Sequence, residues 1–522
     1  MLLACCLGAG CGKETTQPGK DKPHSGGVLR IAAQSPQSLD PIHSRNYWES
    51  EIVLQIFDSL LRFDPYLNLA PALAQDWQVS ADGITYTFHL RKGVRFHDGR
   101  EVVADDVVYS LTRLLDPKWR SDDSQHFSRI VGATEFQAGR ATAVSGLKAL
   151  DASNVQITLD QPYAPFLRVL AQQPASVVPR EELEKSPAAF AQNPVGTGPF
   201  RLERWESGSE MVLVANADYF GGKPFLDELR ITTLPALNAR ESFQLFREKK
   251  LDLSFVPPDQ VLAAQREPDW MFLSRPVLRV MYLGMNLRDR WLKNLEVRQA
   301  IGFAVNKTEL LGEDFDYSQT HGLIPVSLLG ASLDSHPDLY DREKAIQALE
   351  SHRRRGKRRL KLQLWHAQMS ESRNALLSRL ATQLNEVGFE IELKLVPSMS
   401  ELLEKIYAGD TQLFLLGEQM DFPDPDALLN RLFHSKSPGN MFGYANLKVN
   451  ELLHEAQTTL DDSRRAQLYR EIESLILSDC PVLPLAVVKY SLAYQKRVRG
   501  LEVNALGFQY LPLREVWLEP EK

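Results

Sequence analysis

The sequence predicts an α/β protein that is divided into more than one domain. A chain of 522 residues is too long to fold around one hydrophobic core, so two or three domains are expected. Between residues 360 and 395, two stretches of alternating apolar residues flank a stretch in which leucines recur with helical spacing. This order is typical of a strand, a helix and a second strand, and it predicts a sheet that is covered by helices.

The composition is that of an ordinary globular protein and excludes some functions. Hydrophobic residues make up 43% of the chain, charged residues make up 24%, and the formal net charge is -7. This charge argues against a general nucleic-acid binder, which needs a basic face to displace counterions from phosphates. The basic run at residues 352–359 is interpreted as a solvated connection between a helix and a strand. Beyond the N-terminus, no stretch has the roughly 18 consecutive apolar residues of a membrane-spanning helix.

Cysteine usage predicts neither a disulfide framework nor a zinc site. Cys5, Cys6 and Cys11 lie in the first 11 residues, which leaves Cys480 without a partner in the folded body. The opening MLLACCLGAGC resembles the end of a bacterial lipoprotein signal, although it lacks a basic segment and has Gly8 where leucine is usual. A start upstream of Met1 would account for the missing basic segment. The resemblance implies acylation of Cys11, followed by a flexible tether that extends to residue 26.

Residues 82–114 form the most informative stretch of the chain. Ile84, Tyr86, Phe88 and Leu90 alternate with polar residues between two turn sequences, which predicts a strand of a hairpin. Apolar residues then recur with helical spacing until Asp116-Pro117 ends the helix. The stretch also holds histidines and aspartates that suggest metal or acid–base chemistry. Their spacing is not that of metal ligands, and turns and the helix start account for most of them.

Two other segments are read from local signals alone. Residues 52–61 carry apolar residues on one helical face, and we expect a helix over this range. Residues 194–200 (PVGTGPF) hold two glycines and two prolines, but no Gly-Lys-Ser/Thr follows. They therefore predict a tight structural bend and not a phosphate-binding loop.

Several motifs in a fixed order resemble those of one protein family. The chain is similar to the family 5 extracellular solute-binding proteins, the peptide- and nickel-type receptors of bacterial ABC importers, over residues 27–515. The motifs are residues 39–41 (LDP), 59–64 (SLLRFD), 71–74 (PALA), 82–114, 194–200, 216–222 (NADYFGG), 283–287 (LGMNL) and 296–301 (EVRQAI). Family members commonly carry threonine, a helix-capping residue, at the position of Val103.

The resemblance implies a bilobal, periplasmic-binding-protein-like α/β fold of type II, with mixed sheets flanked by helices and a ligand cleft between the lobes. It implies that residues 61–194 form an extra domain packed on lobe I and that residues 273–481 form lobe II. Lobe I would be assembled from residues 27–60, 195–272 and 482–522. The implied protein is a monomeric receptor, not an enzyme, that binds peptides without a cofactor and delivers them to a membrane permease.

The candidate ligand site follows the strand predicted at residues 412–416, because ligands of open α/β sheets lie beyond strand ends. Asp426 is expected to cap the next helix, whereas Asp421 has no local structural role. In peptide-binding relatives, an aspartate at the place of Asp421 pairs with the α-ammonium group of the peptide. Many of these relatives carry tryptophan where this chain has Glu418, and the change indicates an altered amine pocket or another cationic ligand. The other candidate cleft residues are Gln419, Met420, Tyr47, Trp48, Trp365, His366, Phe442 and Tyr444, and for the aromatic residues a core position is an equal alternative.

Three alternatives to a peptide receptor remain open at this point. The same receptor class can take a nickel complex, a sugar or another cationic solute, because one fold hosts many ligands. A lipid-anchored sensor or chaperone would use the same cleft with a different partner. A hydrolase is disfavoured, since the chain lacks His-Glu-x-x-His and Gly-x-Ser-x-Gly motifs. No cation is assigned to a peptide carboxylate, for which Arg275 and Arg288 are only candidates.

Overall fold

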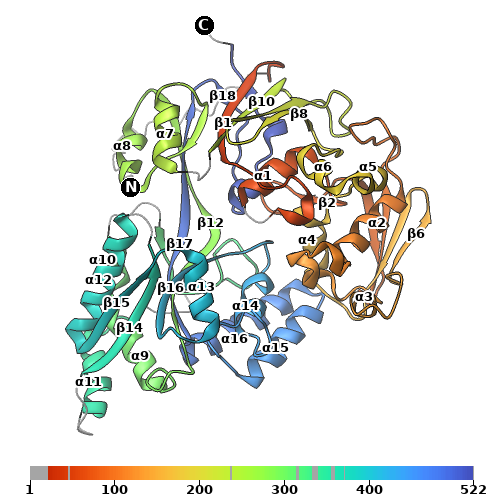
Figure 1. Cartoon of the computed structure of the whole chain (residues 1–522). Helices are drawn as coiled ribbons and strands as arrows, with labels where there is room; N and C mark the ends of the chain where they lie inside the picture. The colour runs from red at the N-terminus through yellow and green to blue at the C-terminus, as the bar shows by residue number, and fades with distance from the viewer. Residues whose placement is uncertain are drawn as a thin grey trace, which may run out of the picture.

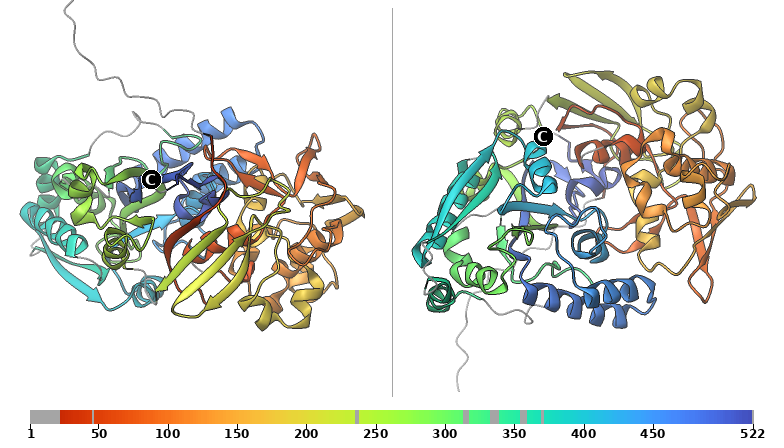
Figure 2. Two further views of the ribbon diagram at one scale, coloured as in Figure 1. Left: turned by 90° about the horizontal axis from the view of Figure 1, so that it is seen from above. Right: turned by 60° about the horizontal axis from the view of Figure 1, so that its bottom comes forward.

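The computed structural model describes residues 22–44, 47–234, 238–312, 317–331, 339–353, 359–368 and 371–520. These residues form three parts, each built on a sheet with helices against it (Figure 1). In the three views, the extra domain lies at one side of the molecule and the largest sheet at the other (Figures 1 and 2). Part of the basic run, residues 354–358, lies outside the described residues, as does Cys11.

Lobe I contains a four-stranded sheet in the order β1 (Val28–Gln34), β10 (Glu228–Leu234), β9 (Glu210–Ala215) and β8 (Phe200–Glu206). β1 pairs in parallel with β10 from Val28 opposite Glu228 to Gln34 opposite Leu234, and the other pairs are antiparallel. Helix α1 (Tyr47–Ile56) shares an apolar core with this sheet. The other helices of lobe I are α7 (Ala239–Arg247) and α8 (Val261–Arg266).

The structure ends α1 one turn earlier than the sequence predicts. Leu61 lies in strand β2 (Leu61–Phe63), which pairs with β3 (Leu69–Pro71). The Gly198 N–H donates to the Ile56 carbonyl over 2.8 Å, so the bend at residues 194–200 packs against the helix end. A Cβ atom at Gly196 would lie 2.0 Å from the Ile56 oxygen, and only glycine fits there. The prediction of a structural bend is confirmed, and the last turn predicted for α1 is wrong.

The extra domain contains a second four-stranded sheet, in the order β4 (Ala74–Val79), β5 (Thr85–Leu90), β7 (Asn154–Thr158) and β6 (Leu147–Asp151). Tyr86, Phe88 and Leu90 are buried on one face of β5, and this confirms the predicted alternation. A tight turn at Gly83 joins β4 to β5, and Gly83 has a φ of 69°. The helices of this domain are α2 (Ala104–Leu115), α3 (Ala133–Gln137), α4 (Phe166–Leu170), α5 (Arg180–Lys185) and α6 (Pro187–Gln192).

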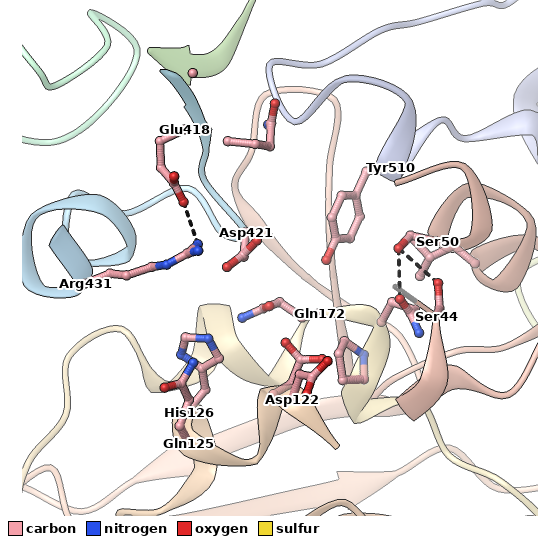
Figure 3. Close-up of a pocket in the computed structure, with 16 residues that line it drawn as sticks. Ser44, Ser50, Asp122, Gln125, His126, Gln172, Glu418, Asp421, Arg431 and Tyr510 are labelled. Carbon is pink, nitrogen blue, oxygen red and sulfur yellow. Dashed lines mark hydrogen bonds and ion pairs between the residues drawn. The ribbon is translucent and has the colours of Figure 1, made fainter. Parts of the chain in front are cut away.

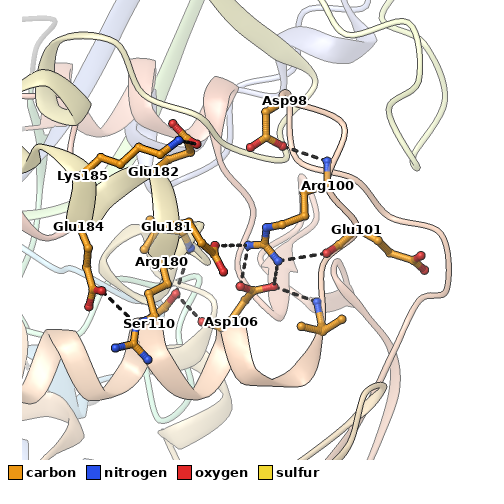
Figure 4. Close-up of polar contacts among 12 residues, drawn as sticks. Asp98, Arg100, Glu101, Asp106, Ser110, Arg180, Glu181, Glu182, Glu184 and Lys185 are labelled. Atoms are coloured by element: carbon orange, nitrogen blue, oxygen red, sulfur yellow. Dashed lines mark hydrogen bonds and ion pairs between the residues drawn. The ribbon is translucent and has the colours of Figure 1, made fainter.

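Helix α2 begins at a residue that has no capping oxygen. Val103 precedes the helix and makes no side-chain cap, but its N–H donates to Asp106 Oδ2 over 2.9 Å. Arg100 donates to both carboxylate oxygens of Asp106, over 3.0 and 2.7 Å (Figure 4). Asp106 therefore replaces part of the missing cap, as its position in the first turn predicts.

The largest sheet has seven strands within the described residues and extends from lobe II into lobe I. The strand order is β11 (Leu253–Phe255), β17 (Val482–Gln495), β12 (Trp270–Met285), β16 (Leu413–Gln419), β14 (Leu360–Ala367) and β15 (Phe389–Val396), with β13 (Tyr317–Gln319) also on β17. β14 and β15 are parallel and are joined through α12 (Glu371–Val387), which confirms the predicted strand–helix–strand unit. The other helices are α9 (Leu295–Ala304), α10 (Lys307–Leu311), α11 (Arg342–Arg353), α13 (Met399–Ala408), α14 (Asp426–Phe433), α15 (Leu447–Thr458) and α16 (Asp462–Asp479).

Two long strands join lobe I to lobe II. β12 and β17 are antiparallel from Trp270 opposite Gln495 to Gly284 opposite Val482. β11 pairs with the lobe I end of β17, and β16 pairs with the lobe II end of β12 (Figure 1). The segment boundaries expected at residues 272 and 482 therefore fall on these two strands, which the lobes share. A short pair, β18 (Val498–Arg499) with β19 (Trp517–Leu518), follows β17.

A threonine at position 103 should strengthen the start of α2. Val103→Thr supplies the missing cap oxygen at nearly constant volume, and a cap contributes about 1 kcal/mol to helix stability. We expect amide hydrogen exchange in the first turns of α2 to slow about fivefold. The control is Val108→Thr, within the same helix, where a hydroxyl has no free N–H to cap. Unchanged or faster exchange in Val103→Thr would show that Asp106 already satisfies the helix start.

The close contact at Gly196 predicts that an alanine there destabilises the protein, whereas an alanine at Gly302 should not. Gly196→Ala forces the bend away from α1 and should destabilise the protein by about 1–3 kcal/mol. At Gly302, within α9, an added Cβ would meet nothing nearer than 3.7 Å, so Gly302→Ala should be neutral or stabilising. Thermal unfolding of the two variants measures the difference. Equal melting temperatures for Gly196→Ala and the unmodified protein would contradict the contact.

Candidate ligand-binding site

A cavity of about 460 Å³ lies where lobe I, lobe II and the extra domain meet. Lobe II contributes the end of β16 and the segment that follows it, the extra domain contributes the 3₁₀ helix η3 (Asp122–Phe127), and lobe I contributes α1 (Figure 3). Its lining residues are Ser44, Ser50, Leu54, Asp122, Asp123, Gln125, His126, Gln172, Gln173, Pro174, Gly417, Glu418, Gln419, Asp421, Arg431 and Tyr510.

Asp421 lines this cavity two residues beyond the end of β16. The pairing of β16 with β12 reaches Gln419 opposite Arg279, so the strand fixes where the following segment leaves the sheet. Among the described residues, no hydrogen bond or ion pair reaches the Asp421 carboxylate. A charged group is costly to desolvate without a partner. The geometry therefore suits a cationic ligand at this position.

Glu418 has a protein partner in the same cavity. Arg431, on α14, forms an ion pair with Glu418, and Arg431 Nη1 lies 2.6 Å from Glu418 Oε1 (Figure 3). Burial raises the pKa of Glu418, Arg431 opposes this shift, and the charge of Asp421 adds to it. Glu418 is thus already paired with Arg431, which leaves Asp421 as the open carboxylate of lobe II in this cavity.

The facing wall of the cavity, on η3, is also acidic. Asp123 is partly buried, and this burial, with the charges of Asp421 and Asp122, raises the pKa of Asp123 to about 7. Burial lowers the pKa of His126, and the negative charge of Asp421 opposes this shift. The His126 ring meets Phe422 edge-on, with ring centroids 5.9 Å apart.

Gln172 is a buried donor in this cavity. Its side chain is 5% exposed, and its Nε2 has no hydrogen-bond partner within the described part of the chain. In Figure 3 the side chain extends into the space between Asp421 and Asp122. A buried amide N–H without an acceptor is uncommon in folded proteins. A ligand that carries a carbonyl oxygen would satisfy it.

The structure places the sequence candidates in three different environments. Asp421, Glu418 and Gln419 line the cavity together, and Gln419 belongs to β16 instead of the loop after it. Met420 lies between them but is 1% exposed and packs in the core. Tyr47 and Trp48 begin α1, whose Ser50 and Leu54 line the cavity.

The aromatic candidates of lobe II lie in its interior. Phe442 stacks between Phe414 and Phe433, and Tyr444 donates to Asp479 over 2.7 Å. Neither residue lines the cavity, and both occupy core positions. They are large, apolar and next to turn glycines, and from sequence this pattern cannot be distinguished from a cleft wall.

The strand end at Trp365 and His366 also lies away from the cavity. Trp365 has the Lys405 ammonium over its ring, 5.6 Å from the centroid. His366 is buried, and this burial, with the charge of Arg373, lowers its pKa to about 4. The two candidates for a peptide carboxylate are likewise not among the lining residues: Arg275 lies on β12, and Arg288 packs against Gly443.

Asp426 does not cap α14 as the sequence suggests. It lies in the first turn of the helix, where its own N–H donates to Asp424 Oδ1 over 3.1 Å. Its carboxylate accepts hydrogen bonds from Tyr163 over 3.0 Å and from Gln457 over 2.9 Å. Arg129 in turn donates to Gln457 over 2.7 Å, so this group joins lobe II to the extra domain.

A second cavity, of about 670 Å³, adjoins the first. Both are lined by Gln125, His126 and Arg431, and the second extends past Arg129 and Tyr407. Within the described residues there is no group of three His, Cys, Asp or Glu residues that could hold a metal ion. Nor does any described helix have both the length and the apolar character to cross a membrane.

Sequence reasoning missed the η3 acids, Gln172, Arg431 and Tyr510. The only local signal was the pair Asp122-Asp123 just after a predicted helix end, and such a pair is usually a solvated turn. Their role depends on which surface of the extra domain faces lobe II, and this is a non-local property of the fold.

Comparisons with known proteins agree with this architecture. Residues 68–440 match the family described as bacterial extracellular solute-binding proteins, family 5 Middle. The chain is 29% identical to the dipeptide-binding protein of Escherichia coli K12, over 84% of this chain and 85% of that protein. It is 26% identical to heme-binding protein A of Haemophilus influenzae, over 97% and 95% of the two chains.

A solved structure shows the same bilobal periplasmic binding fold. The periplasmic binding protein DppA of Helicobacter pylori, in complex with the peptide STSA, superimposes with a TM-score of 0.80 at 25% identity. The superposition covers 95% of this chain and 99% of that one. The family consists of substrate-binding receptors of ABC importers, which act outside the cytoplasm. The match over most of its length shows that the chain belongs to the family 5 bacterial extracellular solute-binding proteins.

Proposed function

We propose that this protein binds di- or oligopeptides in the cavity between its lobes and delivers them unchanged to the permease of an ABC importer. The observation that carries the proposal is Asp421, an open carboxylate on the wall of a cavity between two lobes. The comparisons support the receptor class, and a peptide-binding relative and a peptide-bound structure are among the proteins that the chain resembles.

The chemistry of the site suits the amino end of a peptide. A carboxylate makes a short, charge-assisted hydrogen bond to an ammonium group, at about 2.7–2.9 Å. Gln172 Nε2 is a donor for the first carbonyl oxygen of such a ligand. The cavity of about 460 Å³ holds a small ligand, and the adjoining one leaves room for further residues.

The competing proposal is a receptor of the same class for a non-peptide cation. The acidic lining favours any cationic ligand, and one relative is named for heme. A peptide differs from a bare cation in having a carbonyl oxygen for Gln172, and this difference favours the peptide.

Removal of the Asp421 carboxylate should weaken peptide binding. Asp421→Ala leaves the ammonium group without its partner, and we expect the Kd of Ala-Ala or tri-alanine to rise by more than about tenfold. Isothermal titration calorimetry measures the change. The matched control is Asp218→Ala, an exposed aspartate far from the cavity in sequence, which should bind as the unmodified protein does. Unchanged affinity in Asp421→Ala would remove Asp421 from the site.

The ligand class can be tested without any variant. Native mass spectrometry of protein purified from its host, followed by denaturing release, should show a bound molecule with the mass of a peptide. A saturating peptide, at about 100 times its Kd, should stabilise the protein by about 2.7 kcal/mol in a thermal-shift screen. A screen in which a metal complex or a sugar stabilises the protein while no peptide does would refute the peptide proposal.

We also propose that Cys11 carries the lipid that anchors the receptor outside the cytoplasm. Metabolic labelling with a fatty acid should mark the full-length protein in the membrane fraction, and Cys11→Ser should abolish the label. Cys6→Ser is the matched control and should retain it. A receptor that remains unlabelled and soluble would contradict the anchor.

A further inference from the structure

We infer that the cavity selects ligands with a second positive charge close to the α-ammonium group, that is, peptides whose first residue is lysine or arginine. The inference rests on the proposed peptide function and extends it to the side chain of the first residue. It is carried by the arrangement of acids on the two walls of the cavity and by the buried donor between them.

The cavity holds more negative charge than one ammonium group neutralises. Glu418 is paired with Arg431, and Arg431 is the one lysine or arginine among the described lining residues. This leaves Asp421, Asp122 and Asp123, to which no hydrogen bond or ion pair is made within the described chain. A peptide with a neutral first side chain satisfies Asp421 alone and leaves Asp123, the partly buried acid of η3, unpaired.

The acids belong to opposite walls and so surround the ligand position. Asp421 follows β16 of lobe II, and Asp123 lies on η3 of the extra domain (Figure 3 labels the neighbouring Asp122). Burial is the main cause of the rise of the Asp123 pKa to about 7, and the negative charge of Asp421 adds to this rise. A lysine or arginine at the first position has a flexible stem that carries its charge away from the α-ammonium group. One such residue can therefore reach both walls.

Gln172 provides the independent indication that an organic ligand fills this space. Its Nε2 is buried in the cavity without an acceptor in the described chain, so the site suits an occupant that brings an oxygen as well as cations. A bare diamine or a metal ion has no such oxygen, whereas the first peptide group has one. The donor and the two acidic walls together fit an α-aminoacyl group with a basic side chain.

Calorimetry with matched dipeptides tests the inference on the full-length protein. Lys-Ala and Arg-Ala should bind at least about tenfold more tightly than Ala-Ala, whereas Ala-Lys, in which the same charge is moved, should show no such gain. 1,5-Diaminopentane has both cations but no carbonyl oxygen, so it should bind more weakly than Lys-Ala.

Asp123→Asn should bring the ratio of the Ala-Ala and Lys-Ala dissociation constants to about one. The matched control is Asp218→Asn, an exposed site, which should keep the ratio of the unmodified protein. The dipeptide ratio of the unmodified protein needs no variant, so the test does not depend on the folding of Asp123→Asn.

The ratio of the Ala-Ala to the Lys-Ala dissociation constant should also increase as pH rises. Because the pKa of Asp123 is raised to about 7, its carboxylate forms as pH rises, and a second cation on the ligand favours that form. The preference for Lys-Ala should grow between pH 5.5 and 7.0 and should not grow in Asp123→Asn. Asp421, Asp122 and Arg431 face this group, as does the nearby His126, whose pKa is lowered by burial.

The outcomes separate this inference from the proposal on which it rests. If Ala-Ala binds as tightly as Lys-Ala, the selection of a basic first residue is overturned while the peptide receptor stands. If diaminopentane matches Lys-Ala, the ligand class assigned through Gln172 is overturned. If no dipeptide binds, Lys-Ala included, both the proposed function and the inference are overturned.

Discussion

The pairing of β12 with β17 is the constraint on which the arrangement of the molecule depends. The two strands run side by side from lobe I, where β11 extends the pair, into lobe II, where β16 extends it. β16 ends beside the cavity, so the register of β16 on β12 determines where Glu418 and Asp421 stand. A one-residue slip would turn each side chain to the other face of the sheet and would remove Glu418 from Arg431.

The second requirement is the contact that brings the extra domain against lobe II. In the extra domain, the Tyr163 hydroxyl donates a hydrogen bond to the Asp426 carboxylate, and the Ala164 N–H donates one to the Gln457 carbonyl. Arg129 donates a hydrogen bond to the Gln457 side chain. In this arrangement η3 faces Asp421, so the acidic cavity is assembled from segments nearly 300 residues apart in the chain.

The sequence predicted those features that depend on local patterns. Period-2 alternation identified β5 and β14, and helical spacing identified α12, because burial of one face imposes these periods wherever the element packs. Residues 82–114 first suggest a catalytic cluster, yet Asp106 holds the start of α2 and Gly83 turns a hairpin. This stretch therefore identifies the scaffold and contributes nothing to the cavity.

The remaining features depend on contacts between distant segments. The end of α1 is set by the bend at Gly196 and Gly198, which no periodicity of α1 itself reveals. Asp426 is a residue type that commonly caps helices, but its carboxylate accepts hydrogen bonds from Tyr163 and Gln457 instead. Phe442 and Tyr444 are as suitable for a cleft wall as for a core until their neighbours are known. Family resemblance supplied Asp421, whereas only the folded chain places Asp123 and Gln172 opposite it.

A crystal structure of the protein with a bound peptide tests the central role of Asp421 most directly. The α-nitrogen of the peptide should lie about 2.7–2.9 Å from a carboxylate oxygen of Asp421, inside the cavity between the lobes. A peptide bound with its ammonium group elsewhere, and with Asp421 facing only solvent, would contradict that role.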